Sequence, residues 1–481
     1  MAELCVIDVP DGASLEDLLF AYGVEFPCGG ASLCGGCRVR VVEGNVPVTE
    51  EMRDALSDEE LDSGWRLACK AQVRGRIVLE VGQWNAPILS DDTRIESGSQ
   101  HGFAVAVDLG TTTIVAQLVD LRTGEIHGTR TALNPQSAHG ADVMSRVEFD
   151  LRHPGVLTAT IREAIRAIVA DLRGRESLRE VLVAGNTVMH HLFCGLSVEP
   201  LSHVPFEPSS DGQQTVDFDE LGCPVTFLPC LGGFVGSDIL AGIVAVGLFD
   251  TEDTVALVDL GTNGEIVIGN ARGALCASTA AGPAFEAGRI RMGMRAAPGA
   301  IDRVTRRADG FHCHVIGGVE PRGICGSGLV DAVAAALDSG SVKPNGRIAD
   351  GSKELQLCAP VHLSQADIRE LQLAKGAVAA GFRVLQEQIG VQNSGIARAY
   401  LAGAFGNYVN IASALRIGLL ETEPAKITPS GNTALRGVKM LLSAGDGRDA
   451  MVESVRRRTH HVSLGSDAAF QEQFANCMRL A

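Results

Sequence analysis

Four cysteines near the amino end have the types and the spacing of ligands for a metal centre. Cys28, Cys34 and Cys37 stand at C-x5-C-x2-C in a loop with four glycines, and Cys69 follows after two short helical patterns. Four thiolates around such a loop suit a [2Fe–2S] cluster, because glycines let the backbone wrap closely and direct N–H groups at the sulfurs. Structural zinc with four cysteines usually shows two close pairs, and only Cys34 and Cys37 form one here. The spacing therefore favours an iron–sulfur cluster over zinc.

A second set of residues lies in two similar stretches far apart in the chain. FAVAVDLGTTTIVAQLVD, at 103–120, returns in large part as VALVDLGTNGEIVIGN at 255–270, and Asp108 and Asp259 open the shared Asp-Leu-Gly-Thr. Each copy is an apolar strand, a polar tip and a second apolar strand, which predicts a β-hairpin. A hairpin repeated at this distance indicates a duplicated domain.

The tips of these hairpins could hold a phosphate group. Glycine removes the Cβ atom that would keep a phosphate from the backbone N–H groups, and threonine and asparagine add donors. Asp108 and Asp259 could then hold Mg²⁺ through water, since nucleotide-bound magnesium takes few carboxylates. A single tip would be an ordinary turn, but two copies with matching strands favour a phosphate site. The predicted phosphate-binding residues are Gly110, Thr111, Thr112, Thr113, Gly261, Thr262, Asn263 and Gly264.

Composition limits the partners and the compartment. The formal net charge is −17, from 41 Lys+Arg and 58 Asp+Glu, which argues against nucleic acid and anionic membranes as partners. The start lacks a basic segment followed by an apolar core, and no apolar run approaches the roughly 18 residues that span a bilayer, so we expect a soluble, cytoplasmic protein. In such a protein the other cysteines are expected to be packing residues and not disulfides. These are Cys5, Cys194, Cys223, Cys230, Cys276, Cys313, Cys325, Cys358 and Cys477.

The elements that position these residues can be outlined from the hydrophobic pattern. Residues 1–82 form a compact module, in which LCVIDV and RIVLEV are strands and LEDLLFAYG is a helix opened by a capping box. Residues 83–102 carry Pro, Asp, Ser and Gly without periodicity, which predicts a linker. The duplicated part then divides into 103–250 and 251–481.

Two later stretches repeat a pattern of strand, glycine-rich turn and small-residue helix. The first runs from PVTFLPCL into GGFVGSDILAGIVAVGL, and the second is AYLAGAFGNYVNIASALRIGLL at 399–420. In the second, the turn Gly403-Ala404-Phe405-Gly406 could place adenine against bare backbone. His190 and His191 are adjacent on a predicted helix and point about 100° apart, so they are interpreted as ordinary core or surface histidines and not as a metal pair.

These pieces resemble the actin, Hsp70 and sugar-kinase superfamily of ATPases. The resemblance implies a duplicated RNase H-like α/β fold with subdomains 103–250 and 251–481, phosphate hairpins at 108–113 and 259–264, and an adenosine motif at 401–406. It implies two connecting helices, at 236–247 and 411–420. An acidic residue on the first often positions the attacking group, and Asp238 is the matching candidate for such a catalytic role, with a helix cap as the alternative.

The amino-terminal module resembles β-grasp [2Fe–2S] ferredoxins, with x5 in the first interval as in the adrenodoxin-like branch. Fused to such an ATPase, it narrows the resemblance to the reductive activators of corrinoid proteins. Further stretches similar to that family are NPQSAHGADVMSRV, GNTVMHHLFCGLSVEPLSHVPFEP, AAGPAFEAG, GMRAAPGAI and GICGSGLVDA. Family members are often longer between the two parts, where an added segment can support dimers. Only about 20 residues separate the parts here, which leaves homodimer formation open.

The resemblance implies an ATP- and Mg²⁺-dependent activator that reduces an inactive Co(II) corrinoid (cobalamin-type) protein of a methyltransferase system to Co(I). The electron would come through the [2Fe–2S] cluster on Cys28, Cys34, Cys37 and Cys69 from a low-potential donor. Ferredoxin-type centres lie near roughly −400 mV, so the transfer is expected to run uphill. Two other classes remain open, a small-molecule kinase with a redox domain and a nucleotide-binding redox-sensing adaptor.

Overall fold

The computed structural model describes residues 4–9, 19, 37–71, 73, 75–80, 89–95, 100–140, 142–218, 220–308, 310–465 and 467–481. The predicted ligands Cys28 and Cys34, and most of the helix predicted at 15–23, lie outside the described residues. Within the described part, no helix is both long and apolar enough to cross a membrane.

The amino-terminal module contains a four-stranded antiparallel sheet in the order β1-β4-β2-β3. The strands predicted from LCVIDV and RIVLEV are confirmed as β1 and β4, which pair from Leu4 with Glu80 to Val9 with Gly75. Two short helices connect β2 to β3, and Ser57 and Glu60 form a capping box that starts the second of them. The elements are β1 (Leu4–Val9), β2 (Arg38–Glu43), α2 (Glu50–Ala55), α3 (Asp58–Asp62), β3 (Trp65–Leu67) and β4 (Gly75–Glu80).

The first half of the duplicated part is built on a six-stranded sheet in the order β7-β6-β5-β8-β10-β9. Strands β5, β6 and β7 form an antiparallel meander, and β8 and β10 continue the sheet in parallel with β5. The strands are β5 (Phe103–Leu109), β6 (Thr113–Asp120), β7 (Ile126–Leu133), β8 (Leu178–Gly185), β9 (Gln214–Phe218) and β10 (Cys223–Phe227).

The second half repeats this plan, which confirms the predicted duplication. Its meander is β11-β12-β13, and β19 and β20 continue in parallel from β11. A short strand, β21, adds to the other edge. The strands are β11 (Val255–Leu260), β12 (Gly264–Asn270), β13 (Gly273–Thr279), β19 (Arg398–Ala402), β20 (Ile427–Gly431) and β21 (Thr459–His461).

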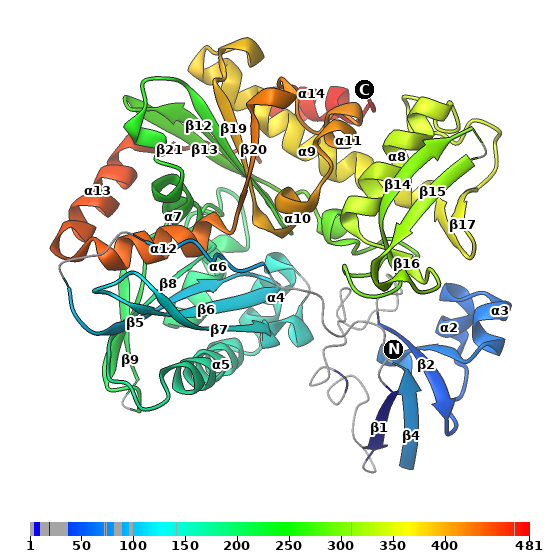
Figure 1. The fold of residues 1–481 in the computed structure, drawn as a ribbon, viewed down its shortest axis with the longest axis horizontal. Helices are drawn as coiled ribbons and strands as arrows, with labels where there is room; N and C mark the ends of the chain where they lie inside the picture. Colours follow the sequence, from blue (N-terminus) through cyan, green and yellow to red (C-terminus); the bar gives the residue numbers. More distant parts are fainter. Residues whose placement is uncertain are drawn as a thin grey trace.

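Helices fill the outer faces and the space between the two sheets (Figure 1). Helix α5 packs its stripe of Leu157, Ile161, Ile165 and Val169 on the first sheet, and α9 packs on β12 and β13 of the second. The helices of the duplicated part are α4 (Val143–Arg152), α5 (Val156–Arg173), α6 (Thr187–Cys194), α7 (Ser237–Ala245), α8 (Gly326–Ser339), α9 (Gln365–Ile389), α10 (Gly403–Tyr408), α11 (Ile411–Arg416), α12 (Thr433–Ser443), α13 (Arg448–Arg458) and α14 (Ala468–Cys477).

The predicted pair of connecting helices is right for the first helix and wrong for the second. Helix α7 packs against α12, whereas α11, within the predicted 411–420, packs against α8. Position in the fold explains the difference, because α7 follows β10 and α12 follows β20, each the second parallel strand beyond a hairpin. The two helices touch at Gly437, where a Cβ atom would lie 1.9 Å from the carbonyl oxygen of Ala241.

A smaller lobe on the second half contains one finding that the sequence did not predict. Cys313 and Cys358, which we expected to be packing residues, form a disulfide with their Cα atoms 6.4 Å apart. They are 45 residues apart in the chain, so spacing could not show that β15 and β17 lie side by side. The lobe's strands are β14 (Ala300–Arg307), β15 (Gly310–Val315), β16 (Gly323–Ile324), β17 (Glu354–Cys358) and β18 (Val361–Ser364).

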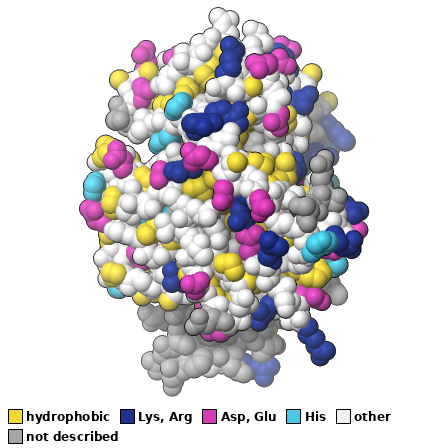
Figure 2. All heavy atoms as spheres, turned by 90° about the vertical axis from the view of Figure 1, so that its left-hand side faces the viewer, with side chains coloured by type: hydrophobic (Ala, Val, Ile, Leu, Met, Phe, Trp, Pro, Cys, Tyr) yellow, Lys and Arg dark blue, Asp and Glu magenta, His cyan; other side chains and the backbone are white. Residues whose placement is uncertain are grey.

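The segment predicted as a linker is packed where the structure describes it. Asp91 is buried and makes ion pairs with Lys439 (2.9 Å) and Arg436 (2.8 Å) of α12. Arg94 reaches the first half and donates to the carbonyl of Thr123. On the face shown in Figure 2, Lys and Arg side chains are interspersed with Asp and Glu.

Candidate functional site

The first hairpin tip closes through a bond that only glycine permits. The N–H of Gly110 donates to the carbonyl of Thr113 at 2.9 Å. A Cβ atom on Gly110 would lie 2.8 Å from that same oxygen, closer than real Cβ atoms come. The second tip closes with a tighter turn, from the N–H of Gly261 to the carbonyl of Asn263 at 3.0 Å, and there a Cβ atom on the glycine would lie 4.0 Å from the acceptor oxygen.

The two tips face each other across a cleft and touch. The hydroxyls of Thr112 and Thr262 lie 3.3 Å apart, and each lies 3.2 Å from the same Glu286 carboxylate oxygen, to which it donates. Glu286 ends a short 3-10 helix, η5 (Pro283–Glu286). Hydroxyls that converge on one carboxylate oxygen could equally converge on a phosphate oxygen.

Besides Glu286, the cleft is lined by Asp108, Asp238, Asp259 and Glu265, and burial disfavours the charged forms of these four carboxylates. Burial raises the pKa of Asp108 to about 6, against a hydrogen bond from Asn432. Burial, and then the nearby charge of Asp108, raises the pKa of Asp238 to about 7. Burial, with the charges of Asp238 and Asp108, raises the pKa of Asp259 to about 7. Burial, with Asp238 and Asp259, raises the pKa of Glu265 well above its ordinary value. A cation would relieve this mutual repulsion.

The chemistry of this donor set fits Mg²⁺ held through water. Among the described residues, no three His, Cys, Asp or Glu side chains are grouped to hold a metal ion directly. Magnesium bound with a nucleotide keeps several waters and takes one or two carboxylates. Asp108 and Asp259, at the ends of the first strands of the two hairpins, could supply them from opposite sides of the cleft.

Asp238 lies in the cleft, at the second position of α7. The helix-cap alternative is wrong, because the N-cap residue is Gly236 and no side chain caps the helix. The Asp238 carboxylate accepts the N–H of Ile239 at 2.9 Å, a bond within its own helix. Its side chain therefore remains available to orient a group in the cleft.

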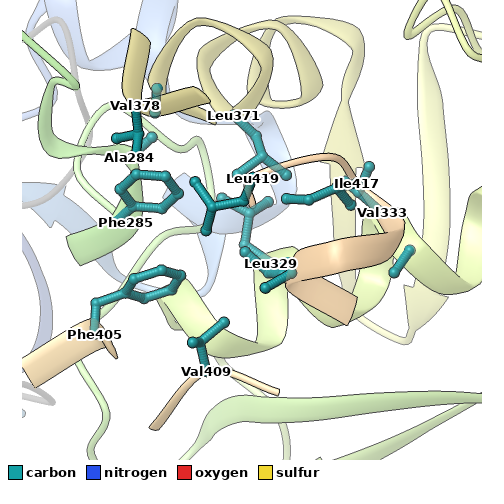
Figure 3. Packing of buried hydrophobic residues seen from close by; sticks show 14 of the residues in the cluster. Ala284, Phe285, Leu329, Val333, Leu371, Val378, Phe405, Val409, Ile417 and Leu419 are labelled. Atoms are coloured by element: carbon teal, nitrogen blue, oxygen red, sulfur yellow. The ribbon is translucent and has the colours of Figure 1, made fainter. Parts of the chain in front are cut away.

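The predicted adenosine turn is the start of helix α10 and lines the cleft beside Asp259 of the second hairpin. Gly403 has φ +79°, and a Cβ atom there would lie 2.5 Å from a carboxylate oxygen of Asp259. Phe405 stacks on Phe285, with ring centroids 4.5 Å apart, as Figure 3 shows. Of the residues predicted to bind the nucleotide and its magnesium, all line the cleft except Gly264 and Gly406.

Sequence reasoning missed two asparagines that hold the tips. Asn432 donates to the Asp108 carboxylate at 2.7 Å and caps α12. Asn186 donates to the hydroxyl of Thr111 at 2.8 Å and caps α6. A signal was present, because Gly-Asn-Thr occurs at 185–187 and again at 431–433. Glu286 and Glu265 were also missed, since Glu286 lies outside both copies of the repeat and Glu265 lies in the second copy but beyond the shared Asp-Leu-Gly-Thr.

His190 and His191, interpreted as core or surface histidines and not as a metal pair, are both core residues. His190 contacts the carbonyl of Gly212 at 3.0 Å, and His191 contacts that of Thr187 at 2.8 Å. Both are buried, and burial lowers the pKa of His190 to about 4.

In the amino-terminal module, two of the four predicted cluster ligands are described. The sulfurs of Cys37 and Cys69 lie 3.3 Å apart although the residues are 32 positions apart in the chain. Cys37 precedes β2, and Cys69 lies in the 3-10 turn η1 (Ala68–Lys70) that follows β3. The fold thus brings two thiols together in the way that a shared cluster requires.

Fold and site together define an ATPase of the actin, Hsp70 and sugar-kinase class that carries a [2Fe–2S] ferredoxin module. Residues 3–74 match the 2Fe-2S iron-sulfur cluster binding domain, residues 103–251 match the RACo middle region, and residues 253–481 match the C-terminal domain of RACo, the ASKHA domain. The chain belongs to the family of reductive activators of corrinoid proteins.

Individual relatives agree with this assignment. The chain is 32% identical over 414 residues to the corrinoid activation enzyme RamQ of Eubacterium limosum, covering 77% of this chain and 69% of RamQ. It is 26% identical over 412 residues to the Co(II) methylated amine-specific corrinoid protein reductase of Methanosarcina barkeri, covering 76% and 75%. A solved structure of a reductive activator for a corrinoid, iron–sulfur protein matches with TM-score 0.69, 26% identity and coverage of 98% and 96%.

Proposed function

We propose that this chain uses ATP to reduce the Co(II) corrinoid of a partner protein to Co(I), and so returns the partner to methyl transfer. The observation that carries the proposal is the combination, in one chain, of a cysteine pair in a ferredoxin module with two phosphate-type tips that meet across a cleft. The proposal places the chain in the cytoplasm, where thiolate ligands stay reduced.

The residues of the module would hold the redox centre. Cys28, Cys34, Cys37 and Cys69 are the proposed ligands, and a [2Fe–2S] cluster bound there would supply one electron at low potential. The sulfurs of Cys37 and Cys69 lie 3.3 Å apart, close enough to serve as ligands of one cluster. A low-potential donor is proposed as the source of the electron.

The residues of the cleft would hold a magnesium nucleotide. The backbone of both tips, with Thr111, Thr112, Thr113, Thr262 and Asn263, would donate to the phosphates. Asp108 and Asp259 would bind the metal's waters. Asp238 would orient the attacking water. Gly403, Ala404 and Phe405 would face the adenosine.

Nucleotide is needed because the electron moves uphill. Each 100 mV of unfavourable potential costs about 2.3 kcal/mol for one electron. Nucleotide binding can offset this free-energy cost only if the nucleotide binds one conformational state of the complex more tightly than another. Hydrolysis then lets the tightly held complex come apart.

A reduction assay tests the proposal. Given a low-potential donor, the Co(II) absorption of the cognate corrinoid protein should convert to that of Co(I) only with MgATP, and ATP hydrolysis should rise when this partner is added. Asp108→Ala and Asp259→Ala should each slow ATP hydrolysis by at least about tenfold, because a mispositioned metal ion stabilises the transition state less well. Neither variant should change the visible spectrum, since the cluster lies in the other module.

The Cys34→Ser variant is the matched control for the redox half. It should lose the visible absorption and the reduction of cobalt, but keep the binding of nucleotide. Full Co(I) formation without ATP, at the same rate and extent, would contradict the proposal. Stimulation of hydrolysis by a small hydroxylated molecule in place of the partner would indicate a kinase instead.

A further inference from the structure

Two segments of the second half run from the nucleotide cleft to the ferredoxin module. One is residues 283–294, which begin in the motif AAGPAFEAG and extend beyond it, and the other is residues 322–327, Arg322 with the first five residues of GICGSGLVDA. The N–H of Ile324 donates to the carbonyl of Met292 at 2.8 Å, and the N–H of Met294 donates back to Ile324 at 3.0 Å. We name this hydrogen-bonded unit the coupling pair.

One end of the coupling pair lies in the cleft. Glu286 accepts the hydroxyls of Thr112 and Thr262, which come from the two phosphate tips. Gly326 and Ser327 line the same cleft. The two segments are in backbone contact here, because a Cβ atom on Gly326 would lie 1.7 Å from the carbonyl oxygen of Phe285. A movement of the first segment at Glu286 should therefore also move the second segment.

The other end of the coupling pair holds the ferredoxin module. The carbonyl of Arg291 accepts the Arg38 guanidinium at 2.7 Å, and Arg38 directly follows the predicted ligand Cys37. Arg322 makes an ion pair with Glu80 of the module at 2.6 Å. Figure 1 shows β16, which includes Ile324, beside the module. The second segment therefore has one end in the cleft and the other on the redox module, and the first segment reaches the module at Arg291, between the cleft residues Glu286 and Met294.

The first segment is also strained between its two ends. Ala287 has φ 60° and Arg289 has φ 59°, in the left-handed region that residues other than glycine seldom adopt. Such strain persists only where surrounding contacts hold it. Glu286 on one side, and Arg291 on the other, with its N–H bonded to Asp367 at 2.7 Å, supply those contacts.

We propose that a nucleotide in the cleft undocks the ferredoxin module by displacing Glu286, and so frees the cluster for its electron partners. The inference rests on the proposed nucleotide site. Phosphate oxygens would take the two hydroxyls that Glu286 now accepts, and the phosphate charge would repel its carboxylate. Release of Glu286 lets Ala287 and Arg289 relax, which shifts Arg291 away from Arg38. By linkage, docking of the module must weaken nucleotide binding by the same factor.

Small-angle scattering of the full chain with its cluster tests the undocking. Saturating MgAMPPNP, a non-hydrolysable ATP analogue, should increase the radius of gyration. Glu286→Gln should bind the analogue without this increase, because a neutral amide is not repelled and can donate to a phosphate. Unchanged scattering of the parent protein, with calorimetric evidence that the analogue is bound, would overturn the undocking and leave the proposed function standing.

Calorimetry of docking variants tests the linkage. Arg38→Ala and Arg322→Ala should each bind MgAMPPNP about fivefold or more tightly than the parent, at the lower end of usual coupling. A merely destabilising change would weaken binding instead. The control is Arg53→Ala, an exposed arginine of α2, which should bind like the parent. Equal affinities in both docking variants would overturn the inference, and no binding by the parent would overturn it together with the proposed nucleotide site.

Discussion

At the scale of single residues, the cleft carries acids that resist ionisation. The pKa values of Asp108, Asp238 and Asp259 are raised to about 6, 7 and 7 by burial and by one another. Without a cation, the folded chain holds these protons more tightly than the unfolded chain does. Their contribution to stability is therefore present below about pH 4, the ordinary aspartate value, and is lost as the pH rises toward 7. Ligand binding has the opposite dependence on pH.

We predict that affinity for MgAMPPNP falls as the pH is lowered from 8 to 6. The carboxylates must lose protons to bind the metal's waters, so affinity should fall by up to about tenfold per pH unit for each proton released. Calorimetry in two buffers of different ionisation enthalpy measures the protons directly. Asp259→Asn should flatten this dependence, whereas the exposed Asp253→Asn should keep it. Affinity independent of pH in the parent would contradict the raised pKa values.

The residues that the sequence could predict are those with a local signal. Asp108 and Asp259 open a repeated motif, and the cysteines have a ligand spacing. The repeated Gly-Asn-Thr marks Asn432 but not its partner, and Glu286 has no such signal: Asn432 lies 324 positions from Asp108, and Glu286 lies 174 positions from Thr112. A single sequence contains no measure of such distances.

At the scale of elements, the approach of α7 and α12 decides how the two halves meet. We predict that Gly437→Ala destabilises the protein by about 1–3 kcal/mol, the usual cost of overpacking. Its Cβ atom would meet the backbone of Ala241, which cannot rotate away. Nucleotide affinity should fall too, since Asn432 caps α12 and bonds Asp108. Urea unfolding and calorimetry measure the two effects.

The control for this substitution is Gly447→Ala. Gly447 has φ −78°, and its added Cβ atom would meet nothing within 4 Å. This variant should be close to the parent in stability. Equal stability of both variants would mean that α7 and α12 can separate without cost.

The sequence predicted both hairpins and α7, but it assigned the wrong partner helix. The strand that leads into α12 is β20, ITPSG, which contains Pro429 and has no apolar alternation. Proline is tolerated there because β20 is an edge strand. The more apolar stretch at 399–420 has the stronger strand-and-helix pattern. Position in the sheet, which a local pattern does not reveal, decides which helix faces α7.

At the scale of the whole molecule, the described part of the predicted linker is a structural element. The ammonium of Lys439 is fully buried and donates to Asp91 through its carboxylate (2.9 Å) and its carbonyl (2.6 Å), and to the carbonyl of Thr93 (2.9 Å). We predict that Asp91→Ala costs about 3–5 kcal/mol, because it leaves a buried charge without its partner. Chemical denaturation measures this loss.

The double variant Asp91→Ala with Lys439→Met provides the control. Removing both charges should restore most of the stability, since replacing a buried ion pair with apolar groups is often neutral. A double variant as unstable as Asp91→Ala alone would show that the lost packing, and not the unpaired charge, is responsible.

The contact between Lys439 and residues 91–93 also determines where a stable fragment of this protein can begin. A fragment that begins at Phe103, where the match to the RACo middle region begins, would keep Lys439 but lose all three of its oxygen acceptors, which belong to residues 91–93. A fragment that begins at Leu89 would keep them, together with the carbonyl that accepts Asn432. An ATPase half made without its redox module should therefore start a dozen or so residues before its first strand.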